Sequence, residues 1–263
     1  MSTRADLAIS ALRKGHDDLS TLVAGLTEAQ LTGPSAASEW DVSQVVSHLG
    51  SGAEINLEAV QASLDGRPAP EFEFNKGVWA RWDGMTALER QAAFPEANRR
   101  LVEVYEAFTP QQREEHRIDI GWMPEPVDVA TSALLRLTEF GYHDWDVRAS
   151  FDPAATLAPE AAALISERVE GLFGWIAKPA NLDGRTAHLL VRLTDTGENL
   201  GLRLADPVAI TEAPETPDGE LSLTLEAWLR LAAGRLKPPY IPADVAVTGP
   251  ISLEDLRAVF PGY

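Results

Sequence analysis

Three residues of this chain have the types and spacing to bind a metal ion together: Glu139 and His143 in the stretch TEFGYHDWD, and His48 far upstream. Residues i and i+4 of a helix lie on one face, about one turn apart, so a carboxylate oxygen and an imidazole nitrogen can converge on one point. Two nitrogens and one oxygen suit a divalent metal such as Zn²⁺. Because three protein ligands leave a coordination position open for water or substrate, this set is typical of a catalytic metal.

Each of these residues also has an ordinary interpretation. A glutamate and a histidine four apart are often a solvated surface pair, and His48, which lies among valines, can be a core histidine bonded to a carbonyl. The context favours a metal, because Glu139 lies in an apolar stretch where a charge needs a partner. Asp146, three residues after His143, is expected to accept a hydrogen bond from a ligand rather than to bind the metal.

Several other polar and aromatic residues can have either a structural role or a role at the site. Arg235 either complements the dipole at the end of a helix or anchors an anion. Trp40 and Trp145 are expected to pack the fold, although an aromatic ring beside an open metal position can also form the wall of a pocket. The remaining histidines, which are interpreted as surface or structural residues, are His16, His116 and His188.

Composition narrows the class of protein. The 263 residues are 45% apolar and 24% charged, a composition that can form a core and argues against disorder. The net charge of −18 repels nucleic acid and anionic membranes, and no signal segment or membrane span is predicted, so we expect a soluble cytoplasmic protein. Cysteine is absent, so any thiol chemistry must use a thiol from outside the chain.

Four helices are expected to position the candidate ligands. Apolar residues at helical spacing predict helices over about 4–26 and 42–64, and the second carries His48. A loop rich in aromatic residues is expected next, followed by a third helix whose capping box begins at Thr86 and which either kinks or starts late because of Pro95. A fourth helix after Pro126 carries the other two ligands. This pattern predicts a four-helix bundle over residues 1–152, whose interior is a usual place for a metal site.

Residues 153–263 show a different pattern. A helix is predicted over 158–176 and two more over 226–233 and 252–260, with short strands near 186–194, 199–206, 206–210, 219–225 and 245–247. This mixture predicts a small C-terminal α+β domain, with a boundary near residue 152. The fold class is therefore α+β overall.

Three stretches resemble the mycothiol-dependent maleylpyruvate isomerase family of actinobacteria. They are W-x-V-x-x-V-x-x-H-L from Trp40 to Leu49, R-x-x-E-x-x-x-H-x-x-D from Arg136 to Asp146, and A-W-L-x-x-x-x-G-R from Ala227 to Arg235. The resemblance implies a DinB-like bundle joined to a domain similar to sterol carrier proteins, zinc on His48, Glu139 and His143, and a catalytic role for Arg235. It also implies mycothiol as thiol cosubstrate. Many members have two adjacent histidines in the second motif, where this chain has Tyr142-His143.

These motifs leave the reaction open between three interpretations. In the first, a metal-activated thiolate attacks a small electrophile, which gives isomerisation or S-transfer, and Arg235 or Arg136 holds a substrate carboxylate. In the second, the protein is a non-catalytic carrier with a structural metal and an apolar ligand in its C-terminal domain. In the third, it is a metal-dependent hydrolase that uses bound water.

Overall fold

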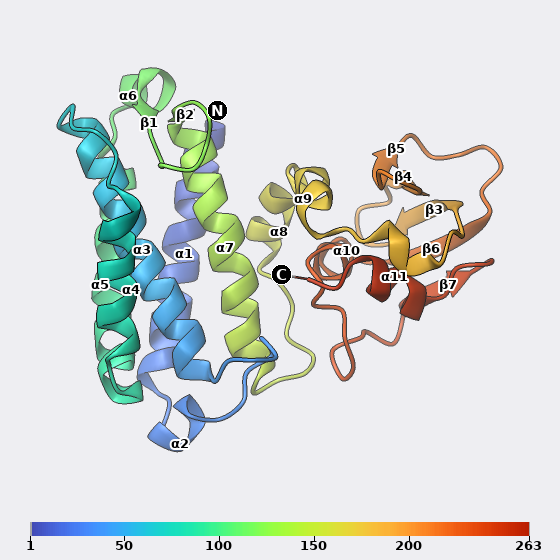
Figure 1. Cartoon of the computed structure of the whole chain (residues 1–263), viewed down its shortest axis with the longest axis horizontal. Helices are drawn as coiled ribbons and strands as arrows, with labels where there is room; N and C mark the ends of the chain where they lie inside the picture. Colours follow the sequence, from blue (N-terminus) through green and yellow to red (C-terminus); the bar gives the residue numbers. More distant parts are fainter. Residues whose placement is uncertain (1, 263) are drawn as a thin grey trace. The chain divides into compact units, whose positions relative to one another are not determined.

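The computed structural model describes residues 2–262 and divides into two compact units, residues 1–152 and 153–263. The first unit is built of helices, and the second combines a sheet with short helices (Figure 1). The predicted α+β class, with a helical N-terminal part and a small C-terminal sheet domain, is confirmed. Among the described residues, no helix is long and apolar enough to cross a bilayer.

Four long helices form the bundle of the first unit: α1 (Arg4–Ala24), α3 (Val42–Leu64), α5 (Ala87–Ala107) and α7 (Val129–Ala149). Helices α3 and α1 each pack against both α5 and α7. The short elements α2 (Glu28–Leu31), α6 (Pro110–Glu115), β1 (Arg117–Ile118) and β2 (Val127–Asp128) lie in the connections. Burial of one apolar stripe from each long helix supplies the core.

A helix, α4 (Phe72–Asp83), replaces the loop that we expected after α3. Only Val78 and Trp82 of this helix are buried, whereas its other aromatic residues are at least 38% exposed, so the apolar pattern lacks the usual single stripe. The Trp82 ring packs over Gly50, where an added Cβ atom would lie 2.1 Å from the ring. The glycine therefore allows α4 to approach α3 closely.

Two further helix boundaries differ from the expectation. Helix α5 begins directly at its capping box and continues through Pro95, so it does not start late. The helix predicted over 158–176 is two helices, α8 (Pro159–Ser166) and α9 (Val169–Ile176). They are separate because the backbone of Arg168, at φ −120° and ψ −1°, leaves the helical region.

The second unit contains a five-stranded sheet in the order β5-β4-β3-β6-β7. Its strands are β3 (Ala187–Leu193), β4 (Asn199–Leu204), β5 (Ala209–Thr211), β6 (Gly219–Leu223) and β7 (Ala246–Thr248). Strands β3 and β6 are parallel, and the other neighbours are antiparallel. The helical elements of this unit are α8, α9, the 3₁₀ turn η1 (Pro179–Leu182), α10 (Leu225–Ala232) and α11 (Leu253–Val259). Rings of Phe173, Trp228 and Phe260 pack together in its core.

Candidate metal centre

Two packed helices of the bundle carry the three predicted ligands. His48 lies on α3, which begins at a capping box between Asp41 and Gln44. Glu139 and His143 lie one turn apart on α7, whose N-cap residue Asp128 accepts a 2.6 Å hydrogen bond from the backbone of Thr131. Because α3 packs against α7, the three side chains come from neighbouring walls of one bundle.

The ligand atoms of these residues converge. The Oε2 atom of Glu139 lies 3.3 Å from Nε2 of His48 and 3.8 Å from Nε2 of His143. One ligand atom from each of the three residues lies within 4.8 Å of the other two. Atoms bound to one zinc ion at about 2.0–2.2 Å are at most about 4.4 Å apart, so only a small inward movement is needed. The donor set and its spacing therefore fit a divalent metal, and no other cluster of this kind is found in residues 2–262.

The environment of the set differs from one ligand to the next. The His143 side chain is 6% exposed, whereas those of His48 and Glu139 are 37% and 44% exposed. The Nδ1 atom of His143 donates a 2.8 Å hydrogen bond to Oδ2 of the fully buried Asp146. This bond leaves the Nε2 lone pair of His143 directed at the ligand set, as is usual for metal-binding histidines.

Glu139 is held as a carboxylate. Loss of hydration on the protein side of the carboxylate raises its pKa, but the hydrogen bond with His48 and the charges of His143, His48 and Arg136 outweigh this effect and lower the pKa to about 2. An ionised carboxylate is the form that binds a metal.

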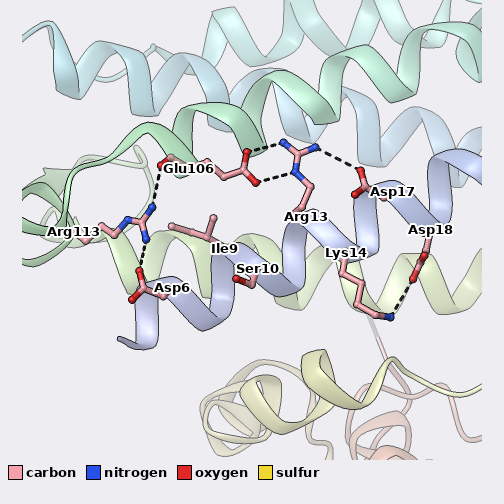
Figure 2. Close-up of a pocket in the computed structure, with 9 residues that line it drawn as sticks. All are labelled: Asp6, Ile9, Ser10, Arg13, Lys14, Asp17, Asp18, Glu106 and Arg113. Atoms are coloured by element: carbon pink, nitrogen blue, oxygen red, sulfur yellow. Dashed lines mark hydrogen bonds and ion pairs between the residues drawn. The ribbon is translucent and has the colours of Figure 1, made fainter. Parts of the chain in front are cut away.

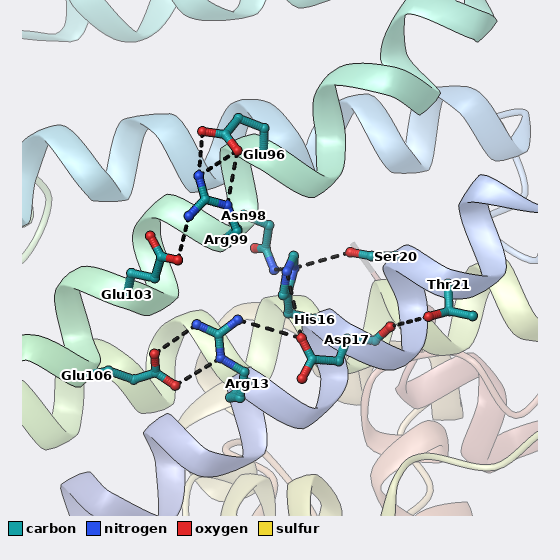
Figure 3. A network of polar contacts seen from close by, with 10 residues as sticks. All are labelled: Arg13, His16, Asp17, Ser20, Thr21, Glu96, Asn98, Arg99, Glu103 and Glu106. Carbon is teal, nitrogen blue, oxygen red and sulfur yellow. Dashed lines mark hydrogen bonds and ion pairs between the residues drawn. The ribbon is translucent and has the colours of Figure 1, made fainter.

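Arg136 lies one turn before Glu139 and is buried between helices. Its Nη2 atom donates to the backbone oxygen of Leu49 at 2.7 Å and to Oδ1 of Asn98 at 3.0 Å. Asn98 in turn contacts Nδ1 of His16, which Figure 3 shows between α1 and α5. These contacts join all four helices, and they tie α7 to the residue that follows His48. Arg136 thus helps to hold the bundle together, although its buried Nε atom has no hydrogen-bond partner among the described residues.

Arg235 lies in the second unit, directly after α10 and Gly234. Its side chain is half-buried, and its Nη1 atom donates a 3.2 Å hydrogen bond to the carbonyl of Ala233. The other histidines have ordinary partners, as expected: Ser20 and Asn98 for His16, Ser63 for His116 and Thr211 for His188.

Of the two tryptophans near His48, the sequence interpretation left Trp40 either in the core or in a pocket wall, and it gave Trp79 no role at the site. Trp40 lies over both histidines, with ring centroids 5.1 Å from His48 and 5.9 Å from His143. Trp79 of α4 lines the same hollow as Trp40 and His48. The signal was present as a run of aromatic residues over 72–82, but only a helical interpretation of that run would have placed Trp79 near α3.

A second hollow of about 480 Å³ on α1 is lined with charge (Figure 2). Its cations are all neutralised by neighbouring acids: Arg13 by Glu106, Lys14 by Asp18 and Arg113 by Asp6. Paired surface charges of this kind have little attraction left for a ligand. The hollow therefore does not compete with the centre on α3 and α7.

Comparison with known proteins points to one family. The family profile described as mycothiol maleylpyruvate isomerase N-terminal domain matches residues 12–148. Among solved structures, the mycothiol-dependent maleylpyruvate isomerase is 16% identical with a TM-score of 0.67, and a histidine-to-alanine mutant of it is 15% identical with the same score. Both comparisons cover 100% of each chain, and at this identity they show a shared fold. No curated protein sequence matches the chain.

Proposed function

The chain belongs to the mycothiol maleylpyruvate isomerase family of enzymes, and we propose that it uses a thiol, mycothiol, to transform a small electrophile at the centre formed by His48, Glu139 and His143. The reaction is either cis–trans isomerisation, with maleylpyruvate as the first substrate to test, or S-transfer. The observation that carries this proposal is the convergence of three metal-binding side chains beside a hollow that is open to small molecules. We expect the reaction to take place in the cytoplasm.

Each residue of the centre has a separate task in this proposal. The two imidazoles and the Glu139 carboxylate hold a divalent metal, with zinc the expected ion, and Asp146 fixes the orientation of His143. When bound, the metal supplies a Lewis acid that lowers the pKa of a nearby thiol. Trp40 covers the two imidazole rings and limits the access of water to them.

The carbon chemistry belongs to the thiol and the substrate. The thiolate sulfur adds to the β carbon of a carbonyl-conjugated C=C bond, the π electron pair moves to the carbonyl oxygen as an enolate, and the substrate rotates about the carbon–carbon single bond that results. Loss of the thiolate restores the double bond in the other geometry, so the thiol is regenerated. If the C–S bond persists, the enolate takes up at its α carbon the equivalent of the proton that the thiol lost, and the outcome is S-transfer to the substrate. The nucleophile comes from outside because the chain has no cysteine.

The metal site is tested by elemental analysis of purified protein. We expect about one divalent ion per chain in the wild type, and loss of the ion in His48→Ala and in His143→Ala. His116→Ala serves as the control, because His116 lies in the same unit but outside the ligand set. Unchanged metal content in both ligand variants would exclude the site.

The thiol reaction is tested by turnover of electrophiles, maleylpyruvate among them, with mycothiol present and absent. We expect turnover only with the thiol, and loss of it in Glu139→Gln. Equal turnover without thiol would favour a hydrolase that uses bound water. Ligand binding without turnover would instead favour a carrier. The carrier interpretation requires an apolar cavity in the second unit, but the hollow of about 690 Å³ there is also lined by the charged residues Asp195, Glu226 and Arg230.

Arg235 is proposed as the group that holds a substrate carboxylate. We expect Arg235→Ala to weaken the use of carboxylate substrates by about 1.5–3 kcal/mol, the value of a charge-assisted hydrogen bond, without loss of metal. The measurement is kcat/KM for a carboxylate substrate and for its neutral ester, together with metal content. Equal effects on both substrates would show that Arg235 has a structural role.

A further inference from the structure

A hollow of about 280 Å³ adjoins the candidate metal centre and shares His48 with it. It lies entirely within the first unit, between the start of α3 and the end of α4. Its volume is just below the range of about 300–1,000 Å³ for whole small-molecule sites, so it can hold part of a ligand. A molecule that reaches the metal with one end can therefore occupy this hollow with another.

Two tryptophans form the apolar part of the hollow. The side chains of Trp40 and Trp79 are 36% and 38% exposed, although each presents a large apolar ring. Neither indole N–H has a hydrogen-bond partner among residues 2–262, so both rings offer an apolar face and a free donor.

The polar part of the hollow is a mixture of neutral and acidic groups. It includes the buried hydroxyl of Ser47, the side-chain amide of Gln44 and the carboxylate of Asp83. Within the described chain, the Ser47 hydroxyl and the Asp83 carboxylate have no hydrogen-bond partner, and the Gln44 amide uses only its oxygen, in the α3 cap. No lysine or arginine lines the hollow. These groups suit a neutral ligand with many hydroxyls, not an anion.

The position of Trp79 is fixed by the packing of α4 on α3. Trp82, one turn further along α4, is buried over Gly50, and its Nε1 atom donates a 3.1 Å hydrogen bond to Glu54 of α3. The same glutamate forms an ion pair with Arg81. Since Trp79 and Trp82 are on one side of the helix, this docking holds the Trp79 ring over the α3 face that carries Ser47.

We propose that this hollow binds the polyhydroxylated portion of the thiol cosubstrate, the aminosugar and cyclitol to which the cysteine of mycothiol is joined. The C–H face of such a ring stacks on tryptophan, while its hydroxyls bond to amide, hydroxyl and carboxylate groups. The shared His48 places the sulfur at the centre and the sugar over α3 and α4. This inference rests on the proposed function, since it assumes a thiol at the metal.

The test compares two thiols on metal-loaded protein by calorimetry. Mycothiol carries the sugar and cyclitol, whereas N-acetylcysteine lacks them. We expect the wild type to bind mycothiol at least about tenfold more tightly, and Trp79→Leu or Ser47→Ala to remove most of that preference without changing the affinity for N-acetylcysteine. Trp122→Leu is the matched control, because Trp122 is an exposed tryptophan of the same unit that does not line the hollow.

Equal affinity of the wild type for the two thiols would contradict the proposed subsite. A Trp79→Leu variant that binds both thiols more weakly by the same factor would contradict it too. Metal content and melting temperature of each variant are measured in parallel, so that a folding defect is recognised. If Trp79→Leu has such a defect, Ser47→Ala tests the subsite instead, because it does not change the packing of α4. If neither thiol bound or supported turnover, the proposed function itself would fail. Binding of both thiols without preference would overturn this inference alone.

Discussion

The hydrogen bond between Asp146 and His143 decides which imidazole nitrogen faces Glu139. Because Asp146 is fully buried and accepts from Nδ1, the neutral ring must present the lone pair of Nε2 to the other ligands. The ring is also held at a fixed angle before any metal binds. A carboxylate in this position increases the basicity of the ligand as well, so it affects affinity without touching the ion.

Asp146→Asn is therefore expected to weaken metal binding by about 10–100-fold while all three ligands remain. The measurement is a competition titration of zinc against a chelator of known affinity. Asp144→Asn is the control, because Asp144 adjoins His143 in the sequence but its carboxylate pairs with Arg148 at 2.8 Å. Equal affinities for wild type and Asp146→Asn would contradict the role of the hydrogen bond.

His16 gives the bundle a pH-dependent stability. Burial lowers its pKa, the charge of Arg13 lowers it further, and Asp17 opposes these effects. Its Nδ1 atom faces the amide nitrogen of Asn98 and the hydroxyl of Ser20, so it acts as an acceptor in the neutral ring and loses those bonds on protonation. The other charged groups near the ring are Arg99 and Glu103 of α5 (Figure 3).

The unfolded chain therefore binds a proton at His16 more readily than the folded one, so stability from this group is present above about pH 6.5 and decreases as the pH falls below it. We expect the difference in unfolding free energy between pH 7 and pH 5 to be smaller in His16→Gln, whose amide oxygen can still accept from Asn98. Urea unfolding of metal-free protein at both pH values measures it. Parallel pH profiles for the two proteins would show that His16 does not contribute.

At the scale of elements, substitutions of two glycines by alanine test how closely α4 packs on α3. Gly50→Ala places a Cβ atom 2.1 Å from the buried Trp82 ring, a steric cost of about 3 kcal/mol that exceeds the gain in helix propensity of about 1 kcal/mol. Gly77 of α4 has no atom within 4 Å of an added Cβ, so Gly77→Ala is expected to stabilise by about 0.5–1 kcal/mol. Thermal unfolding measures both, and a stable Gly50→Ala would show that α4 adjusts freely.

The elements that the sequence predicted well are those with both a cap and one apolar stripe. Helix α3 begins where Asp41 and Gln44 form their capping box, and α7 carries the ligand pair at the expected spacing. Helix α4 was missed because its exposed aromatic residues conceal the period set by Val78 and Trp82. The hollow at Trp79 could not be predicted either, because it depends on how closely α4 approaches Gly50, which is a property of packing rather than of spacing.

At the scale of the whole molecule, net charge and unit organisation matter most. The charge of −18 repels anions at long range, so a carboxylate substrate requires a local cation, whereas a neutral polyol does not. All three candidate ligands belong to the unit of residues 1–152, and each unit has its own buried core. The metal should therefore stabilise one unit directly and leave the other unchanged.

Calorimetry of the whole chain before and after chelation tests this expectation. We expect two unfolding transitions. Removal of the metal should lower the transition temperature of residues 1–152 only. At a free ion concentration of about 100 times Kd, binding adds about 2.7 kcal/mol, which for a unit of this size corresponds to roughly 5–10 °C. His48→Ala, treated identically, should show no shift, because it has no site to empty. A single transition that moves as a whole would mean that the two units unfold together, and an unchanged thermogram would mean that the metal does not bind the folded bundle in preference to the unfolded chain.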